Sequence, residues 1–122
     1  MKIFITGVAG FLGSHLADLM ISEGHTVAGN DNMIGGYTDN VPQNVEFHQV
    51  DCCDLENMTK AMEGCDIVYH TAATAYEGLS VFSPVLVTRN IFEASVTTIT
   101  AAIRNKVKRI VYCSSMARYG HH

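Results

Sequence analysis

Positive charge is scarce in this sequence of 122 residues, and charge of either sign is low. Eight Lys and Arg residues stand against twelve Asp and Glu residues, which gives a formal net charge of −4 at pH 7. Because phosphates repel an acidic chain, this balance excludes general binding to nucleic acids or to anionic membranes. Charged residues make up 16% of the chain and hydrophobic residues 48%, a composition typical of a folded domain and not of a disordered segment.

Long hydrophobic runs are also missing. No apolar run approaches the roughly 18–20 residues that span a bilayer, and the first residues, MKIFITG, lack the layout of a signal peptide. The length is that of one ordinary domain. We therefore expect a single-domain cytoplasmic protein with no membrane partner.

The cysteines lack the spacing of a metal ribbon. Cys52 and Cys53 are adjacent, and Cys65 and Cys113 follow after wide gaps, so no Cys-x-x-Cys pair is present. The histidines likewise have no partners at metal-ligand spacing. We expect reduced thiols in a reducing compartment and no metal site.

Short apolar runs alternate with segments of helical periodicity. This pattern predicts strands at residues 2–6, 26–30, 45–48, 65–70 and 109–113, with helices that begin near Leu12, Asp54 and Ser83. The order β-α-β-β-α-β-α-β predicts an α/β fold, in which a mostly parallel sheet of about five strands carries helices on both faces.

Two details refine this pattern. Val45 and Phe47 alternate with polar residues, which predicts a strand at the edge of the sheet. Ser83 before Pro84 predicts a helix start with the Ser83 hydroxyl as its cap. Residues 31–44, rich in polar residues and glycine, are expected to form a loop.

The most informative stretch joins the first strand to the first helix. Gly7, Gly10 and Gly13 are spaced three apart there. Gly7 permits a tight turn, Gly10 lets a diphosphate approach the backbone, and Gly13 lets helix and strand pack closely. The helix N-terminus would then offer its unpaired N–H groups to the phosphates.

An acidic residue follows at the spacing expected for a dinucleotide site. Asp31 ends the second predicted strand, 18 positions after Gly13, close to the roughly 20 expected for a ribose-binding acid. Its carboxylate would repel a 2′-phosphate, and no arginine lies in the following loop, so NAD is favoured over NADP. The alternative is an ordinary tight turn followed by a solvated loop aspartate.

The Gly-x-x-Gly-x-x-Gly spacing resembles that of the extended short-chain dehydrogenase/reductase superfamily. The sequence of this stretch is similar to that of the NAD-dependent nucleotide-sugar epimerases and dehydratases. Further matches are Asp31-Asn32, Val50-Asp51, Val68-Tyr69-His70-Thr71-Ala72-Ala73 and Ser114-Ser115. The resemblance covers essentially the whole chain. It implies a Rossmann-type three-layer αβα fold over residues 1–120, truncated relative to the full family fold and without a substrate domain. His121 and His122 are left out as a possible tag remnant.

The resemblance also implies a set of NAD-binding residues. Phe11 and Leu12 would contact the diphosphate, Asp31 and Asn32 the adenosine ribose, and Asp51 and Cys52 the adenine. Ala72 and Ala73 would line the path to the nicotinamide, and Asn90 would support the coenzyme from a helix. The complete set of expected NAD-binding residues is Gly7, Gly10, Phe11, Leu12, Gly13, Asp31, Asn32, Asp51, Cys52, Ala72, Ala73 and Asn90.

The catalytic residues of the resembled family are only partly present. Ser115 stands at the place of the family's catalytic serine, with a strand-end capping hydroxyl as the alternative. The family's Tyr-x-x-x-Lys base is not found in these residues, and Tyr119 matches a strand-end Tyr-Gly instead. We therefore expect a chain that binds NAD(H) but does not turn over a nucleotide sugar alone. A non-catalytic NAD(H) sensor and an oligomerising structural domain are the alternatives, and the resemblance further implies a homodimer formed through the long helix after Ser83.

Overall fold

The computed structural model describes residues 1–73, 77–115 and 119–120. The five strands are β1 (Lys2–Thr6), β2 (Thr26–Asn30), β3 (Val45–His48), β4 (Ile67–His70) and β5 (Arg109–Tyr112). The helices are α1 (Phe11–Ser22), α2 (Leu55–Ala61), α3 (Glu77–Phe82), α4 (Pro84–Thr88) and α5 (Ala94–Arg104), with a 3₁₀ turn η1 (Thr38–Asn40) and a π-helix η2 (Arg89–Glu93). Residues 116–118, His121 and His122 lie outside the described part.

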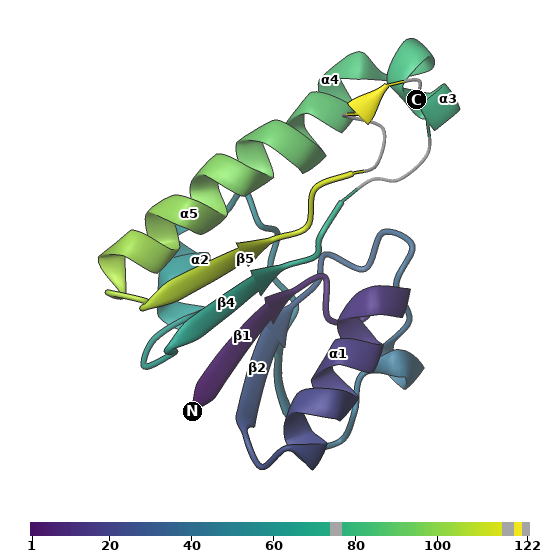
Figure 1. Cartoon of the computed structure of the whole chain (residues 1–122). Helices are drawn as coiled ribbons and strands as arrows, with labels where there is room; N and C mark the ends of the chain where they lie inside the picture. The colour runs from purple at the N-terminus through teal and green to yellow at the C-terminus, as the bar shows by residue number, and fades with distance from the viewer. Residues whose placement is uncertain (74–76, 116–118, 121–122) are drawn as a thin grey trace.

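All strands are parallel, in the order β3-β2-β1-β4-β5. Helix α1 covers one face of the sheet, and α2 and α5 cover the other (Figure 1). The predicted three-layer α/β architecture is confirmed, as is the position of β3 at a sheet edge. No helix in the described ranges is long and apolar enough to cross a membrane.

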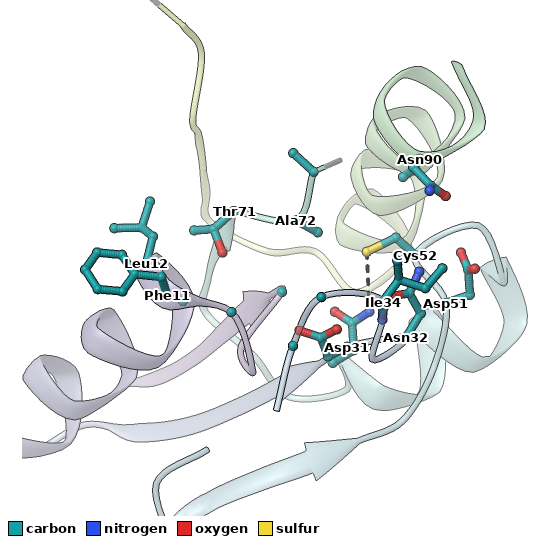
Figure 2. Close-up of a pocket in the computed structure, with 18 residues that line it drawn as sticks. Phe11, Leu12, Asp31, Asn32, Ile34, Asp51, Cys52, Thr71, Ala72 and Asn90 are labelled. Atoms are coloured by element: carbon teal, nitrogen blue, oxygen red, sulfur yellow. Dashed lines mark hydrogen bonds between the residues drawn. The ribbon is translucent and has the colours of Figure 1, made fainter. Parts of the chain in front are cut away.

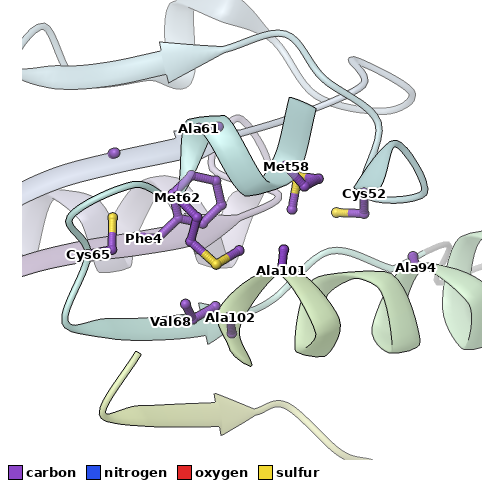
Figure 3. Packing of buried hydrophobic residues seen from close by; sticks show 11 residues of the cluster. Phe4, Cys52, Met58, Ala61, Met62, Cys65, Val68, Ala94, Ala101 and Ala102 are labelled. Carbon is purple, nitrogen blue, oxygen red and sulfur yellow. The ribbon is translucent and has the colours of Figure 1, made fainter. Parts of the chain in front are cut away.

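The face under α2 and α5 carries the larger core cluster. Phe4 of β1 and Val68 of β4 pack against Met58 and Met62, which come from α2 and the residue that ends it (Figure 3). Helix α5 contributes only small buried residues, such as Ala101, so it can lie close to the sheet.

Helix α1 buries small residues against the sheet rather than its leucines. Gly13 and Ala17 are buried against the sheet, and Leu16 is half-buried, but Leu12 and Leu19 are about half exposed. At Gly13 the reason is steric, because α1 begins so close to the turn after β1 that no side chain fits between them there.

The long helix predicted after Ser83 is correct in place but not in detail. Ser83 precedes α4, yet its hydroxyl forms no capping hydrogen bond. The helical path then passes through the π-helix η2 before it continues as α5. The apolar residues at helical spacing face outward, whereas Ala94 and Thr98 are buried. The exposed residues are Phe92, Val96, Ile99 and Ile103.

Candidate coenzyme site

A cavity of about 290 Å³ opens at the carboxyl edge of the sheet. It lies where β1 and β4 are neighbours although their following segments run to opposite faces, which is where parallel α/β sheets bind ligands. Every residue expected to bind NAD lines this cavity, including Phe11, Asp31, Cys52 and Asn90 (Figure 2). Residues far apart in the sequence, from Gly7 to Ala94, thus meet at one edge.

The glycine wall, residues 7–13, forms one side of the cavity. Gly7 adopts a φ of +69°, as a tight turn requires. A Cβ at Gly13 would overlap the carbonyl oxygen of Gly7, so only glycine fits between helix and turn. A Cβ at Gly10 would instead meet one described atom within 4 Å, the same oxygen at 3.2 Å. The space beside Gly10 is therefore open to a ligand.

The N-terminus of α1 has the features of an anion-binding site. In this described segment no side chain caps the helix at Gly10, and no acidic residue occupies its first turn. By helix geometry the N–H groups of the first turn have no partner within the helix. The side chain of Phe11 is largely exposed and that of Leu12 about half exposed, and both residues line the cavity (Figure 2).

Asp31 has a structural role that the sequence did not reveal. Its Oδ2 accepts a hydrogen bond from the Ala9 N–H at 3.1 Å, and its Oδ1 accepts one from the Met33 N–H at 2.8 Å. The carboxylate is buried and so braces the glycine wall from the end of β2. Each oxygen keeps a further lone pair, which is what two ribose hydroxyls would need.

The far end of the cavity is formed by Asp51, Cys52 and Asn90 (Figure 2). Asp51 Oδ1 accepts the Cys53 N–H at 2.8 Å, which fixes the turn that carries both residues. Burial raises the pKa of the Cys52 thiol to about 11, so it stays protonated at neutral pH. Asn90 lies on η2, and π-helical turns occur frequently at functional sites.

The β4 wall, residues 71–73, forms a second side of the cavity, next to the glycine wall. Thr6 holds its backbone, because Thr6 Oγ1 accepts the N–H groups of Thr71 at 3.0 Å and Ala72 at 3.1 Å, and the Thr71 hydroxyl donates to the Thr6 carbonyl. The two walls are in contact, since a Cβ at Gly7 would lie 2.9 Å from Ala72 Cα.

Ser115 follows β5 at the same edge of the sheet and is exposed. It is not among the described residues that line the cavity, unlike the twelve expected NAD-binding residues. In the described ranges, no group of three or more His, Cys, Asp or Glu side chains could hold a metal ion. All four cysteines are free thiols.

Six residues line the cavity without having been predicted. One signal was available for two of them, because the pair Gly35-Gly36 lies in the loop after Asp31. This loop folds back over the glycine wall, where the Tyr37 N–H and the Asn40 side chain both donate to Ala9 O. The six residues are Asn30, Ile34, Gly35, Gly36, Thr71 and Ala94.

The parallel sheet, the glycine wall and the acid after β2 define a Rossmann-like α/β domain with a dinucleotide-type cavity. Comparison with known proteins extends this class to a family. The model of the NAD dependent epimerase/dehydratase family matches residues 3–122, and the chain belongs to that family.

Relatives within the family differ in reaction. The chain is 31% identical to a probable UDP-arabinose 4-epimerase of Arabidopsis thaliana, over 97% of this chain and 31% of the relative. It is 28% identical to a UDP-N-acetyl-alpha-D-glucosaminuronate decarboxylase of Bacillus cytotoxicus, over 98% of this chain and 38% of the relative. The chain therefore spans about a third of the length of these relatives.

Solved structures agree with the family assignment. A UDP-glucose 4-epimerase of Thermus thermophilus in complex with NAD has a TM-score of 0.90 and 33% identity, over 94% of this chain and 38% of that one. A UDP-glucose 4-epimerase of Thermotoga maritima with UDP-glucose has a TM-score of 0.91 and 31% identity, again over 94% and 38%. The expected Rossmann-type fold and the choice of NAD as the family's coenzyme are confirmed.

Proposed function

We propose that these 122 residues form the NAD(H)-binding part of a nucleotide-sugar epimerase or dehydratase. The observation that carries the proposal is the cavity between the glycine wall and the β4 wall, because it gathers an open helix N-terminus and a buried acid. The family match over residues 3–122 and the NAD complex of a structural neighbour support it.

The residues present fit the coenzyme. The backbone N–H groups at Phe11 and Leu12 would bind the diphosphate, since they begin an uncapped helix. Asp31 and Asn32 would bind the adenosine ribose, and Asp51 with Cys52 would border the adenine. Gly10 leaves the space that the diphosphate needs.

Two further contacts complete the proposed site. Ala72 and Ala73 would line the path to the nicotinamide, and Asn90 would support the coenzyme from η2. Bound NAD would supply hydride acceptance and return at a sugar carbon. Ser115 would hydrogen-bond the sugar oxygen from the end of β5.

Catalysis by these 122 residues alone is not expected. The Tyr-x-x-x-Lys base is not among them, so no group is available to take the sugar hydroxyl proton as the hydride leaves. Calorimetric titration should give saturable binding of NAD and NADH, with much weaker binding of NADP, and no epimerisation of a UDP-sugar. Absence of NAD binding by the folded chain would overturn the proposal and favour a purely structural domain.

The long helix also favours a homodimer. Val85, Phe92, Val96, Ile99 and Ile103 are exposed along α4, η2 and α5, and they form an apolar stripe at helical spacing. An apolar stripe of this length on a surface helix indicates a protein–protein contact.

Light scattering tests the dimer. The double change Phe92→Ser and Ile103→Ser should convert a dimer to a monomer, whereas Leu19→Ser, at an exposed position of α1, should not. A monomeric mass for the unchanged chain would contradict the proposal.

The free thiols of all four cysteines favour a reducing compartment such as the cytoplasm.

A further inference from the structure

A chain of side-chain hydrogen bonds crosses the carboxyl edge of the sheet from β1 through β4 to α5. Thr6 Oγ1 lies 2.7 Å from His70 Nδ1, and His70 Nε2 lies 3.1 Å from Ser95 Oγ. The Ser95 hydroxyl in turn donates to Ile91 O at 2.6 Å. Thr6 and His70 are buried, and neither they nor Ser95 belong to the described residues that line the cavity.

Counting donors and acceptors fixes the direction of every bond in this chain. Thr6 Oγ1 already accepts two backbone N–H groups, from Thr71 and Ala72. A hydroxyl has two lone pairs and one proton, so the Thr6 hydroxyl can only donate to His70 Nδ1. His70 must therefore carry its proton on Nε2, which donates to Ser95 Oγ.

These bonds connect three sides of the cavity. Thr6 directly precedes Gly7 of the glycine wall, and it holds the β4 wall through Thr71 and Ala72. Ser95 directly follows Ala94, which lines the cavity from α5. Movement of His70 would therefore displace residues at all three sides of the cavity.

We propose that His70 is a positioning residue: as the neutral Nε2–H tautomer it keeps the β4 wall in place, so that affinity for NAD falls when the ring is protonated. This inference rests on the proposed function, because it concerns the affinity of the cavity for NAD. The ring of His70 acts on the wall through the Thr6 hydroxyl.

Protonation would place a second N–H against a hydroxyl whose lone pairs are both occupied. Thr6 would have to release the N–H of Thr71 or Ala72 to accept it, and the β4 wall would move. Burial lowers the pKa of His70, which agrees with a ring held neutral.

The groups around the ring come from three elements. Thr6 faces it from β1, Ser95 from α5 and Tyr112 from β5, whose ring stacks at a centroid distance of 5.8 Å. Tyr112 is the titratable side chain among these neighbours. In the described part of the chain, no carboxylate forms an ion pair with His70.

The tautomer can be tested without coenzyme. In a nitrogen-15 correlation spectrum of the histidine rings at pH 8, His70 should show a protonated Nε2 and a bare Nδ1, with its signals assigned by their loss in His70→Asn. A proton on Nδ1, or a doubly protonated ring, would overturn the proposal.

Calorimetry then tests the link to affinity. As the pH falls from 8 towards 5, NAD affinity of the unchanged chain should fall, reaching about a tenfold loss once His70 is fully protonated, because one of two partly buried N–H groups then loses its acceptor. His70→Asn keeps an acceptor for Thr6 but cannot be protonated, so its pH-dependent fall should be lost, with affinity at pH 8 reduced a few-fold. The control is His48→Asn. His48 is a partly exposed histidine on β3, two strands from β1 and in register with Thr6 through Asn30, so this variant should show the same loss of NAD affinity with falling pH as the unchanged chain.

The two proposals fail differently. If the unchanged chain binds NAD and His70→Asn keeps the same fall with pH, the positioning role is wrong and the proposed function stands. If the folded chain binds no NAD at any pH, the proposed function fails and the link to affinity fails with it. Thermal melting of each variant separates these outcomes from loss of folding, and Thr6→Ser, which keeps the hydroxyl, should retain the pH dependence.

Discussion

The two walls of the cavity are built in different ways. The glycine wall is held by the backbone, since Gly7 turns at a positive φ and Gly13 packs too close to that turn for any side chain. The β4 wall contains no glycine and is held by side chains. Thr6 reaches it from a position 65 residues before Thr71, and His70 supports Thr6 from the strand that leads into the wall.

This difference separates a wall that depends on residue size from one that depends on hydrogen bonding. Small increases in volume should damage the glycine wall, whereas loss of one hydroxyl should damage the β4 wall.

The largest effect is expected for Gly13→Ala. The added methyl group would overlap the carbonyl of Gly7, and the atoms nearest to it are backbone atoms of Gly7 and Val8, which cannot turn away. We expect a loss of about 3 kcal/mol or more in the free energy of unfolding, measured by urea denaturation. A loss below about 1 kcal/mol would show that α1 can move away from the turn.

The next effect is expected for Thr6→Val, which keeps the volume and removes the hydroxyl. The N–H groups of Thr71 and Ala72 would lose their shared acceptor, at a cost of about 2–3 kcal/mol in the free energy of unfolding. Thr6→Ser should cost less than about 1 kcal/mol because the acceptor remains. Equal losses in the two variants would mean that packing, and not hydrogen bonding, holds this wall.

A smaller effect, on binding more than on folding, is expected for Gly10→Ala. Its backbone, at φ −82°, suits alanine, and the new methyl group would enter the space proposed for the diphosphate. We expect about a tenfold loss of NAD affinity by calorimetry, equivalent to about 1.4 kcal/mol. Stability should fall by no more than about 1 kcal/mol. Unchanged affinity would place the diphosphate elsewhere.

The smallest effect is the pH dependence of stability from His70. Burial lowers the pKa of this ring in the folded chain, so the unfolded chain binds more protons as the pH falls below the ring's ordinary value of 6.5. The stabilisation is full above that pH and is lost as the pH falls towards the folded pKa. Urea denaturation from pH 7.5 to pH 5 should show a steeper fall in the unchanged chain than in His70→Asn.

Much of the fold was predictable because its signals are local. Glycine spacing, helical periodicity and the alternation at Val45 and Phe47 each depend on neighbouring residues, and the order of strands along the chain that they predicted is the observed one. The short helix α3 and the π-helix η2 were not predicted, since six or five residues give too little periodicity to recognise.

The site likewise combines features that could be predicted from the sequence with features that could not. The residues expected around NAD do gather at one edge of the sheet. They could be predicted because the resemblance identifies them by their order along the chain. The bracing of Ala9 by Asp31 was missed, and so was the bond between Thr6 and His70. His70 appeared in the sequence as one more histidine without a metal partner.

By itself the sequence determined a parallel sheet with a tight glycine turn at its centre, since backbone conformation at Gly7 and close packing at Gly13 follow from the absence of a side chain. Only the tertiary structure decided which polar groups meet above that turn. Thr6 and His70 become partners because β1 and β4 pair in register, and a hydrogen bond forms only between groups that the fold brings within about 3 Å.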